Sequence, residues 1–85
     1  MFEAMVTIQL KEGISDPEGA NTLKALKLLG FDGVKEAKMS KTLHLLIDSS
    51  SEVMVRKDVE KMCQRLLTNP VIHQYEIEVN EKQDR

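Results

Sequence analysis

The chain has 85 residues, of which 41% are hydrophobic and 31% charged, and its formal net charge at pH 7 is −2. This length fits one domain with a thin core, because a chain of this size buries only roughly 60–65% of its unfolded surface. Contacts with a partner subunit commonly supplement such a core. The slightly acidic charge balance excludes a surface built to neutralise nucleic-acid phosphates.

The single cysteine, Cys63, excludes an intramolecular disulfide and a cysteine-rich zinc site. The first residues carry no basic region of the kind that opens an export signal, and no segment approaches the ~18 apolar residues that span a bilayer. We therefore expect a cytoplasmic protein that is neither exported nor embedded in a membrane.

The first half of the chain predicts a strand and then a helix. Residues 2–10 alternate apolar and polar side chains, the pattern of a strand with one face on a core. Asp16 can accept hydrogen bonds from the free N–H groups of a helix that starts at Pro17, and Gly30 suits a left-handed cap at its end. The core-facing side of this helix is predicted to carry Ala20, Leu23, Leu26 and Leu29.

The middle of the chain predicts a hairpin. A weakly apolar segment, 34–39, leads through a turn at Ser40 and Lys41 into the strand 42–48. The turn lacks the Asn-Gly or Asp-Gly pair typical of tight hairpins, so the sequence leaves the register open.

A second helix and a last strand follow. Serines 49–51 offer hydroxyl caps for the helix, and Pro70 requires it to end by Thr68. Residues 75–79 then alternate as a strand, and the polar residues 80–85 are expected to fray. The stripe that this helix turns to the core is predicted to be Val55, Val59, Met62 and Leu66.

These elements predict an α+β fold with one domain over residues 1–85. The order strand, helix, strand, strand, helix, strand (βαββαβ) is typical of a two-layer sandwich, with two helices on one face of a four-stranded antiparallel sheet. The other sheet face has no helix to cover it. Met5, Thr7, His44, Leu46 and Ile72 are expected to contribute to that face.

No residue pattern indicates catalysis. Cys63 is expected to be a packed small hydrophobe, and neither His44 nor His73 has further metal ligands grouped beside it. The four glycines are dispersed and form no phosphate-binding loop. Glu76 and Glu78 share one strand face, and solvation explains them better than acid–base chemistry. The residues therefore predict no catalytic, cofactor or metal site.

Two segments resemble the PurS family, the small subunits of phosphoribosylformylglycinamidine (FGAM) synthase. Residues 10–19 resemble the junction between the first strand and first helix of that family, where a basic–acidic pair precedes Asp-Pro. Residues 62–72, continued by Tyr75 and Glu76, resemble its second helix, Asn-containing break and last strand. The length and the element order also agree, so the resemblance covers essentially the whole chain.

The resemblance implies a non-catalytic structural subunit in purine biosynthesis. It implies that the chain joins a large synthetase subunit, PurL, to a glutaminase subunit, PurQ, and supports ammonia transfer between them. ATP, magnesium and glutamine would then be bound by those partners, and this chain would bind no cofactor. A first step of self-pairing to a dimer or tetramer is expected. As candidate contact residues we take Arg65, Asn69, Pro70, Ile72, Leu46 and Met5.

Two other readings stay open at this stage. A regulatory domain of ACT type shares the predicted element order and senses small ligands, but fold analogy alone supports it. An acylphosphatase-like enzyme would need an arginine in a phosphate-binding loop after the first strand, where residues 11–15 supply only Lys11.

Overall fold

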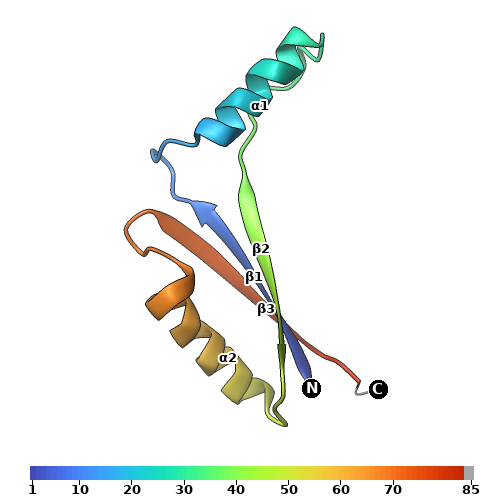
Figure 1. Ribbon diagram of the computed structural model, residues 1–85, viewed down its shortest axis with the longest axis vertical. Helices are drawn as coiled ribbons and strands as arrows, with labels where there is room; N and C mark the ends of the chain where they lie inside the picture. The colour runs from blue at the N-terminus through green and yellow to red at the C-terminus, as the bar shows by residue number, and fades with distance from the viewer. Residues whose placement is uncertain (84–85) are drawn as a thin grey trace.

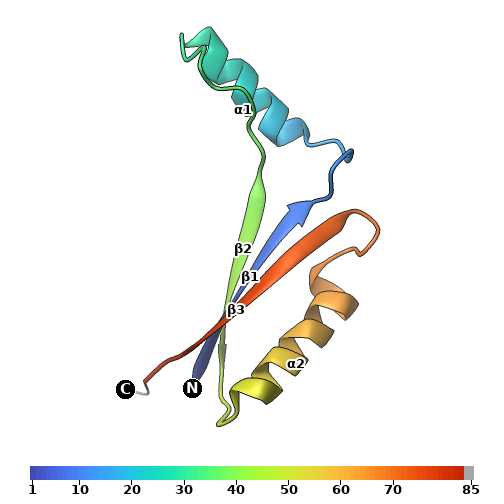
Figure 2. The same cartoon turned by 180° about the vertical axis from the view of Figure 1, so that it is seen from behind.

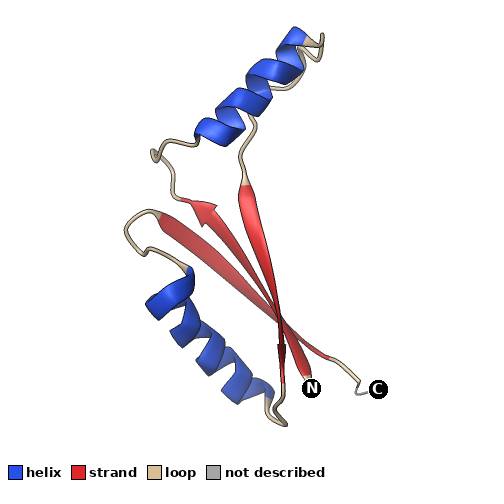
Figure 3. Cartoon of the chain, viewed as in Figure 1, coloured by secondary structure: helices blue, strands red, loops and turns tan. Residues whose placement is uncertain are grey.

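Three strands form an antiparallel sheet in the order β2-β1-β3. Strand β1 (Phe2–Leu10) lies between β2 (Ser40–Ile47) and β3 (His73–Glu81) (Figures 1 and 3). The computed structural model describes residues 1–83 and joins the strands through two helices, in the order βαβαβ. The predicted α+β class is therefore confirmed, although the sheet has three strands and not four.

The core is built on one face of β1, the central strand. Every second side chain of β1 points to that face, as the period of two in the sequence predicts. The buried residues of β1 are Phe2, Ala4, Val6 and Ile8, none of them more than 7% exposed.

Helix α2 (Glu52–Met62) lies along β1 and β3 and covers this face (Figure 2). Its first turn is capped by Ser51, whose Oγ accepts a hydrogen bond of 3.3 Å from the backbone N–H of Met54. Val55 and Val59 point into the core and are fully buried. The α2 side chains and the β1 face thus form a single hydrophobic cluster.

Beyond Val59 the predicted helical stripe is wrong. Met62 is 38% exposed and Leu66 82% exposed, whereas Cys63 is fully buried and Leu67 packs against the core. The inward positions continue at steps of four, from Val55 and Val59 to Cys63, and a π-helical turn, Cys63–Leu67 (η1), then follows α2. A π turn adds one residue to the helical repeat, so Leu67 takes the inward position that Leu66 would hold in a regular α-helix.

Helix α1 (Pro17–Leu28) has close to its predicted bounds but does not cover the sheet. It projects beyond the end of the sheet (Figure 1), and the Cα radius of gyration is 16.7 Å, against about 12 Å for a compact chain of this length. Only α2 packs on the sheet, so the prediction of two helices on one face is wrong. Of the predicted α1 core stripe, Leu23 and Leu26 are half-buried, and Ala20 and Leu29 are exposed.

The predicted strand over 34–39 is also wrong, because this segment runs back along α1 (Figures 1 and 2). A Cβ at Gly19 would collide with the carbonyl oxygen of Ala37, so helix and returning chain touch through their backbones. Val34 and Ala37 are half-buried at a spacing of three, not the spacing of two that a strand requires. Strand β2 begins at Ser40, where a hairpin turn was expected.

Asp16 holds together the two ends of this projection, residues 16–39, which we call the arm. Its Oδ1 accepts a hydrogen bond of 2.9 Å from the N–H of Gly19 and caps α1. Its Oδ2 accepts another of 2.9 Å from the N–H of Met39, 23 residues further along the chain. One carboxylate therefore joins the two ends of the arm. We call this base of the arm, around Asp16 and Met39, the elbow.

The two ends of the described chain meet at the opposite end of the sheet (Figure 1). The backbone N–H of Lys82 donates to the carbonyl oxygen of Met1 at 2.7 Å. Strand β3 runs through Glu81, two residues into the segment that was expected to fray. The rest of the predicted tail extends to residues 84 and 85, outside the described part.

We expect Val59→Ala to lower the free energy of unfolding by about 2 kcal/mol, because it removes two buried methyl groups and leaves a cavity. Urea denaturation at fixed protein concentration measures this loss. The matched control is Val53→Ala on the same helix, where the side chain is 62% exposed and the change should stay within about 0.5 kcal/mol. Equal losses for the two variants would contradict the described core.

We also expect the base of the arm to loosen in acid. The backbone N–H groups of Gly19 and Met39 stabilise the Asp16 carboxylate and hold its pKa below the ordinary value of 3.8. The stabilisation is complete above the unfolded pKa and is lost as pH falls through the lower folded pKa. Amide NMR shifts of Gly19 and Met39 should therefore titrate below pH 3.8. This titration should vanish in Asp16→Asn and persist in the control Asp32→Asn.

Candidate subunit-interaction surfaces

The predicted contact residues fall on two separate surfaces. Met5 and Leu46 share the sheet face opposite α2, here called the outer face. Met5 pairs with His44, and Leu46 pairs with Glu3, so Met5 and Leu46 are diagonal neighbours on adjacent strands. Leu46 is 63% exposed and Met5 is half-buried. The structure thus brings these two predicted residues together.

The outer face is mostly polar. Thr7 and Thr42 share a hydrogen bond of 3.3 Å between their hydroxyls, and Glu76 and Glu78 project from β3 on the same side. A partner on this face would meet hydrogen-bonding groups and carboxylates around one apolar spot at Leu46. Besides Met5 and Leu46, the outer face carries Glu3, Thr7, Gln9, Ser40, Thr42, His44, Gln74, Glu76, Glu78 and Asn80.

The second surface is the loop that joins η1 to β3, residues 68–72. Asn69 organises it: its Oδ1 accepts from the N–H of Val71 at 3.0 Å, and its N–H donates to Nδ1 of His73 at 2.9 Å. Lys11 ties the loop to the end of β1, with Nζ donating to the carbonyl oxygen of Pro70 at 2.6 Å. The loop is therefore held in one shape by side-chain hydrogen bonds.

Arg65 and Ile72, which flank this loop, differ in exposure. Arg65 is exposed on η1. Ile72 is half-buried, and its carbonyl oxygen accepts from the N–H of Lys11 at 2.8 Å. Its even number in the strand pattern had predicted a place on the outer face, but Ile72 lies in the turn before β3, outside the paired residues that form that face.

Two residues that were considered for catalysis, Cys63 and His73, have contacts of the kind that stabilise a fold. Cys63 is fully buried, and burial, followed by the nearby Glu60 charge, raises the pKa of its thiol. The Nδ1 of His73 accepts the Asn69 N–H within the loop. Among residues 1–83, no group of three or more His, Cys, Asp or Glu side chains lies close enough to hold a metal ion. No helix of that same range is long and apolar enough to cross a membrane.

Glu60 also fastens α2 to β3. The hydroxyl of Tyr75 donates to Oε1 of Glu60 at 2.5 Å, and this bond raises the pKa of the Tyr75 phenol. Gln64 donates to the same oxygen at 3.4 Å. The carboxylate thus positions a helix against a strand.

A third surface escaped the sequence analysis. At the tip of the arm, Leu28 is 80% exposed, Leu29 73% and Phe31 57%. The helical spacing of the leucines had predicted a helix packed on the sheet of the same chain. Such spacing does not distinguish packing within the chain from packing against another molecule. The signal that was available is Leu28, which lies about 100° around the helix from Leu29 and outside the predicted stripe, so the apolar surface extends beyond one core-facing side.

Comparisons with known proteins agree with these features. A family profile described as "PurS: Phosphoribosylformylglycinamidine (FGAM) synthase" matches residues 3–81. The PurS subunit of Methanocaldococcus jannaschii is 46% identical over 79 residues, which cover 93% of this chain and 95% of the relative. The PurS subunit of Archaeoglobus fulgidus is 47% identical over 74 residues, covering 87% and 92%.

Solved structures give the same result. The crystal structure of M. jannaschii PurS superposes with a TM-score of 0.89 at 43% identity, covering 98% of this chain and 100% of that one. A chain in the structure of PurLQS from Thermotoga maritima superposes with a TM-score of 0.84 at 26% identity, covering 93% and 96%. The chain described here therefore belongs to the PurS family of FGAM synthase subunits.

Proposed function

We propose that this chain is the non-catalytic small subunit of an FGAM synthase and holds a glutaminase subunit and a synthetase subunit in register. The observation that carries the proposal is its similarity to a chain in the PurLQS assembly. The surfaces described above support it, because they are shaped by internal hydrogen bonds and yet expose apolar side chains.

Ammonia chemistry explains why such a subunit would be needed. Ammonia released from glutamine is largely protonated near neutral pH, and the ammonium ion has no lone pair with which to attack. Transfer between two active sites is efficient only if the sites are aligned and shielded from water. A small bridging subunit provides that alignment without contributing a reacting group.

In this proposal the cofactors belong to the partners. ATP, magnesium and glutamine are bound by the PurL-type and PurQ-type subunits, and this chain binds none of them. Its contacts with those subunits use the outer face at Met5 and Leu46 and the loop at Arg65, Asn69, Pro70 and Ile72. The predicted cytoplasmic location is part of the same proposal.

Self-association is the second part of the proposal. The tip of the arm exposes three large apolar side chains, and within residues 1–83 helix α1 does not pack on the sheet, so burial of these side chains requires another molecule. The inner face beside α2 is incompletely covered, since Leu43 of β2, which pairs with Val6, is 37% exposed. Two copies that exchange arms would cover both surfaces in a closed dimer.

We expect this chain to be required for glutamine-dependent FGAM formation by its cognate PurL-type and PurQ-type subunits. The ammonia-dependent reaction should need it much less, because added ammonia bypasses transfer between sites. Reconstitution with and without the chain, assayed with each nitrogen donor, measures the difference. Equal glutamine-dependent turnover in the two mixtures would refute the bridging role.

The double substitution Leu28→Ser and Leu29→Ser should weaken self-association at least about tenfold, since each leucine contributes roughly 1.5–3 kcal/mol when buried. Sedimentation over a concentration series measures the dissociation constant. Leu66→Ser is the matched control, because Leu66 is equally exposed but lies on η1. A wild-type chain that stays monomeric at micromolar concentration would disprove the arm exchange.

A further inference from the structure

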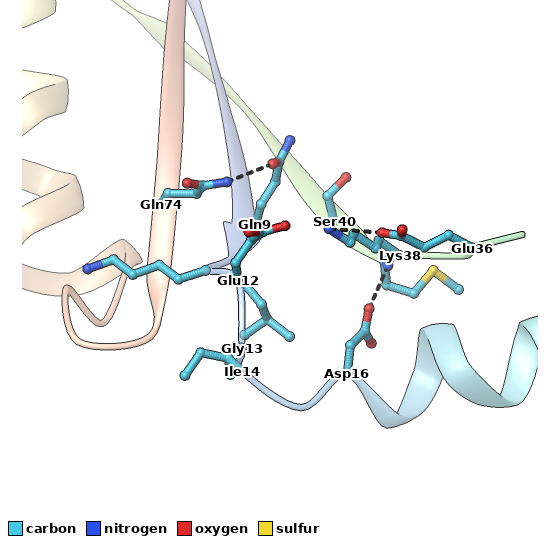
Figure 4. Close-up of a pocket in the computed structure, with 12 residues that line it drawn as sticks. Gln9, Glu12, Gly13, Ile14, Asp16, Glu36, Lys38, Ser40 and Gln74 are labelled. Carbon is cyan, nitrogen blue, oxygen red and sulfur yellow. Dashed lines mark hydrogen bonds and ion pairs between the residues drawn. The ribbon is translucent and has the colours of Figure 1, made fainter.

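An open pocket of about 480 Å³ lies at the elbow, between the base of the arm and the end of the sheet (Figure 4). This volume lies within the roughly 300–1,000 Å³ of sites that enclose a ligand group. Gly13 allows the wall to form: its φ of 83° turns the chain after β1, and Glu12 and Ile14 line the pocket on either side of it. Gln9 and Ser40 line it from the ends of β1 and β2.

The charges of the pocket do not balance. Lys38 pairs with Glu36 at 2.9 Å, and the Asp16 carboxylate is occupied by two backbone N–H groups. Lys11 also lines the pocket, but its amino group is bound to the carbonyl oxygen of Pro70 outside it. Glu12 has no ion pair and no hydrogen bond within residues 1–83. One carboxylate is thus left without a direct cationic partner.

The electrostatic surroundings of Lys38 also show an excess of negative charge in the pocket. Glu36, Glu12 and Asp16 all raise the pKa of the Lys38 ammonium group, and the Glu36 hydrogen bond contributes most. Three carboxylates therefore act on one lysine. A positive group that enters the pocket gains favourable electrostatic energy, and a negative group is repelled.

We propose that the elbow pocket receives a basic side chain, an arginine or a lysine, from a partner subunit of the FGAM synthase, and that Glu12 is its ion-pair partner. The proposal rests on the bridging function proposed above. The unpaired carboxylate of Glu12 favours a positively charged occupant, and the other side chains of the pocket suit the shape of an arginine or a lysine. Leu10, Ile14 and Met39 offer apolar surface to the stem of the side chain, and Ser40 offers a hydroxyl to its head.

The amide pair at the rim completes the fit. Nε2 of Gln74 donates to Oε1 of Gln9 at 3.3 Å, which leaves Oε1 of Gln74 available to accept from an incoming N–H. A guanidinium group has five N–H donors in one plane, so it can bind a carboxylate and an amide oxygen together. The pocket therefore suits the planar guanidinium group of an arginine better than an apolar side chain.

The test replaces Glu12 and measures assembly with the cognate PurL-type and PurQ-type subunits. Glu12→Lys should weaken binding of the small subunit at least about tenfold, and Glu12→Gln by less. Both variants should show a weaker salt dependence than wild type. Glu81→Lys makes the same charge change at the opposite end of β3 and should leave the affinity unchanged. Circular dichroism and sedimentation of the isolated variants check the fold and self-association.

Three results would overturn the proposal. In the first, Glu12→Lys binds the partners as tightly as wild type while wild type still supports glutamine-dependent turnover, which leaves the bridging function intact. In the second, Glu12→Lys weakens only self-association, which assigns the pocket to a second copy of this chain. In the third, Glu81→Lys weakens binding as much as Glu12→Lys does, which means that the loss of affinity comes from the change in net charge and not from the pocket.

Discussion

The packing of α2 against the inner face of β1 is the constraint on which the rest of the molecule depends. Val55 and Val59 meet a strand whose inward side chains are buried from Phe2 to Ile8, and every buried hydrophobic residue in the described part of the chain belongs to this one cluster. A three-stranded sheet is narrow, so one helix occupies most of its inner face. The second helix has no equivalent place in the same chain, and the arm is the result.

The sequence predicted the parts of the fold that local patterns determine. The bounds of β1, the Asp16-Pro17 start of α1, the Gly30 cap and the end of α2 before Pro70 follow from alternation and capping, which act over a few residues. Three features could not be predicted in this way. The backbone contact of Gly19 with Ala37, the Met39 bond to Asp16 and the π turn at Cys63–Leu67 each depend on long-range packing or on a shift in helical repeat.

Local patterns also located some of the candidate contact residues and not others. Met5 and Leu46 follow from strand alternation once the pairing is known, whereas Ile72 lies in a turn that alternation does not describe. The apolar arm was mistaken for a core helix because its leucines have the spacing of one. The ACT-type alternative was based on a four-stranded element order, and the described part of the chain has three strands.

The chain thus combines loops and caps held by hydrogen bonds with incomplete burial, and both features suit the proposed bridging role. Its two described ends add a practical consequence. Met1 and Lys82 are hydrogen-bonded to each other at the end of the sheet farthest from the elbow (Figure 1). A fluorophore or affinity handle attached at Met1 would sit remote from the arm, the loop at Asn69 and the elbow pocket. Contacts of those three surfaces can therefore be followed from this end, whereas Leu46 of the outer face pairs with Glu3 and lies close to the label.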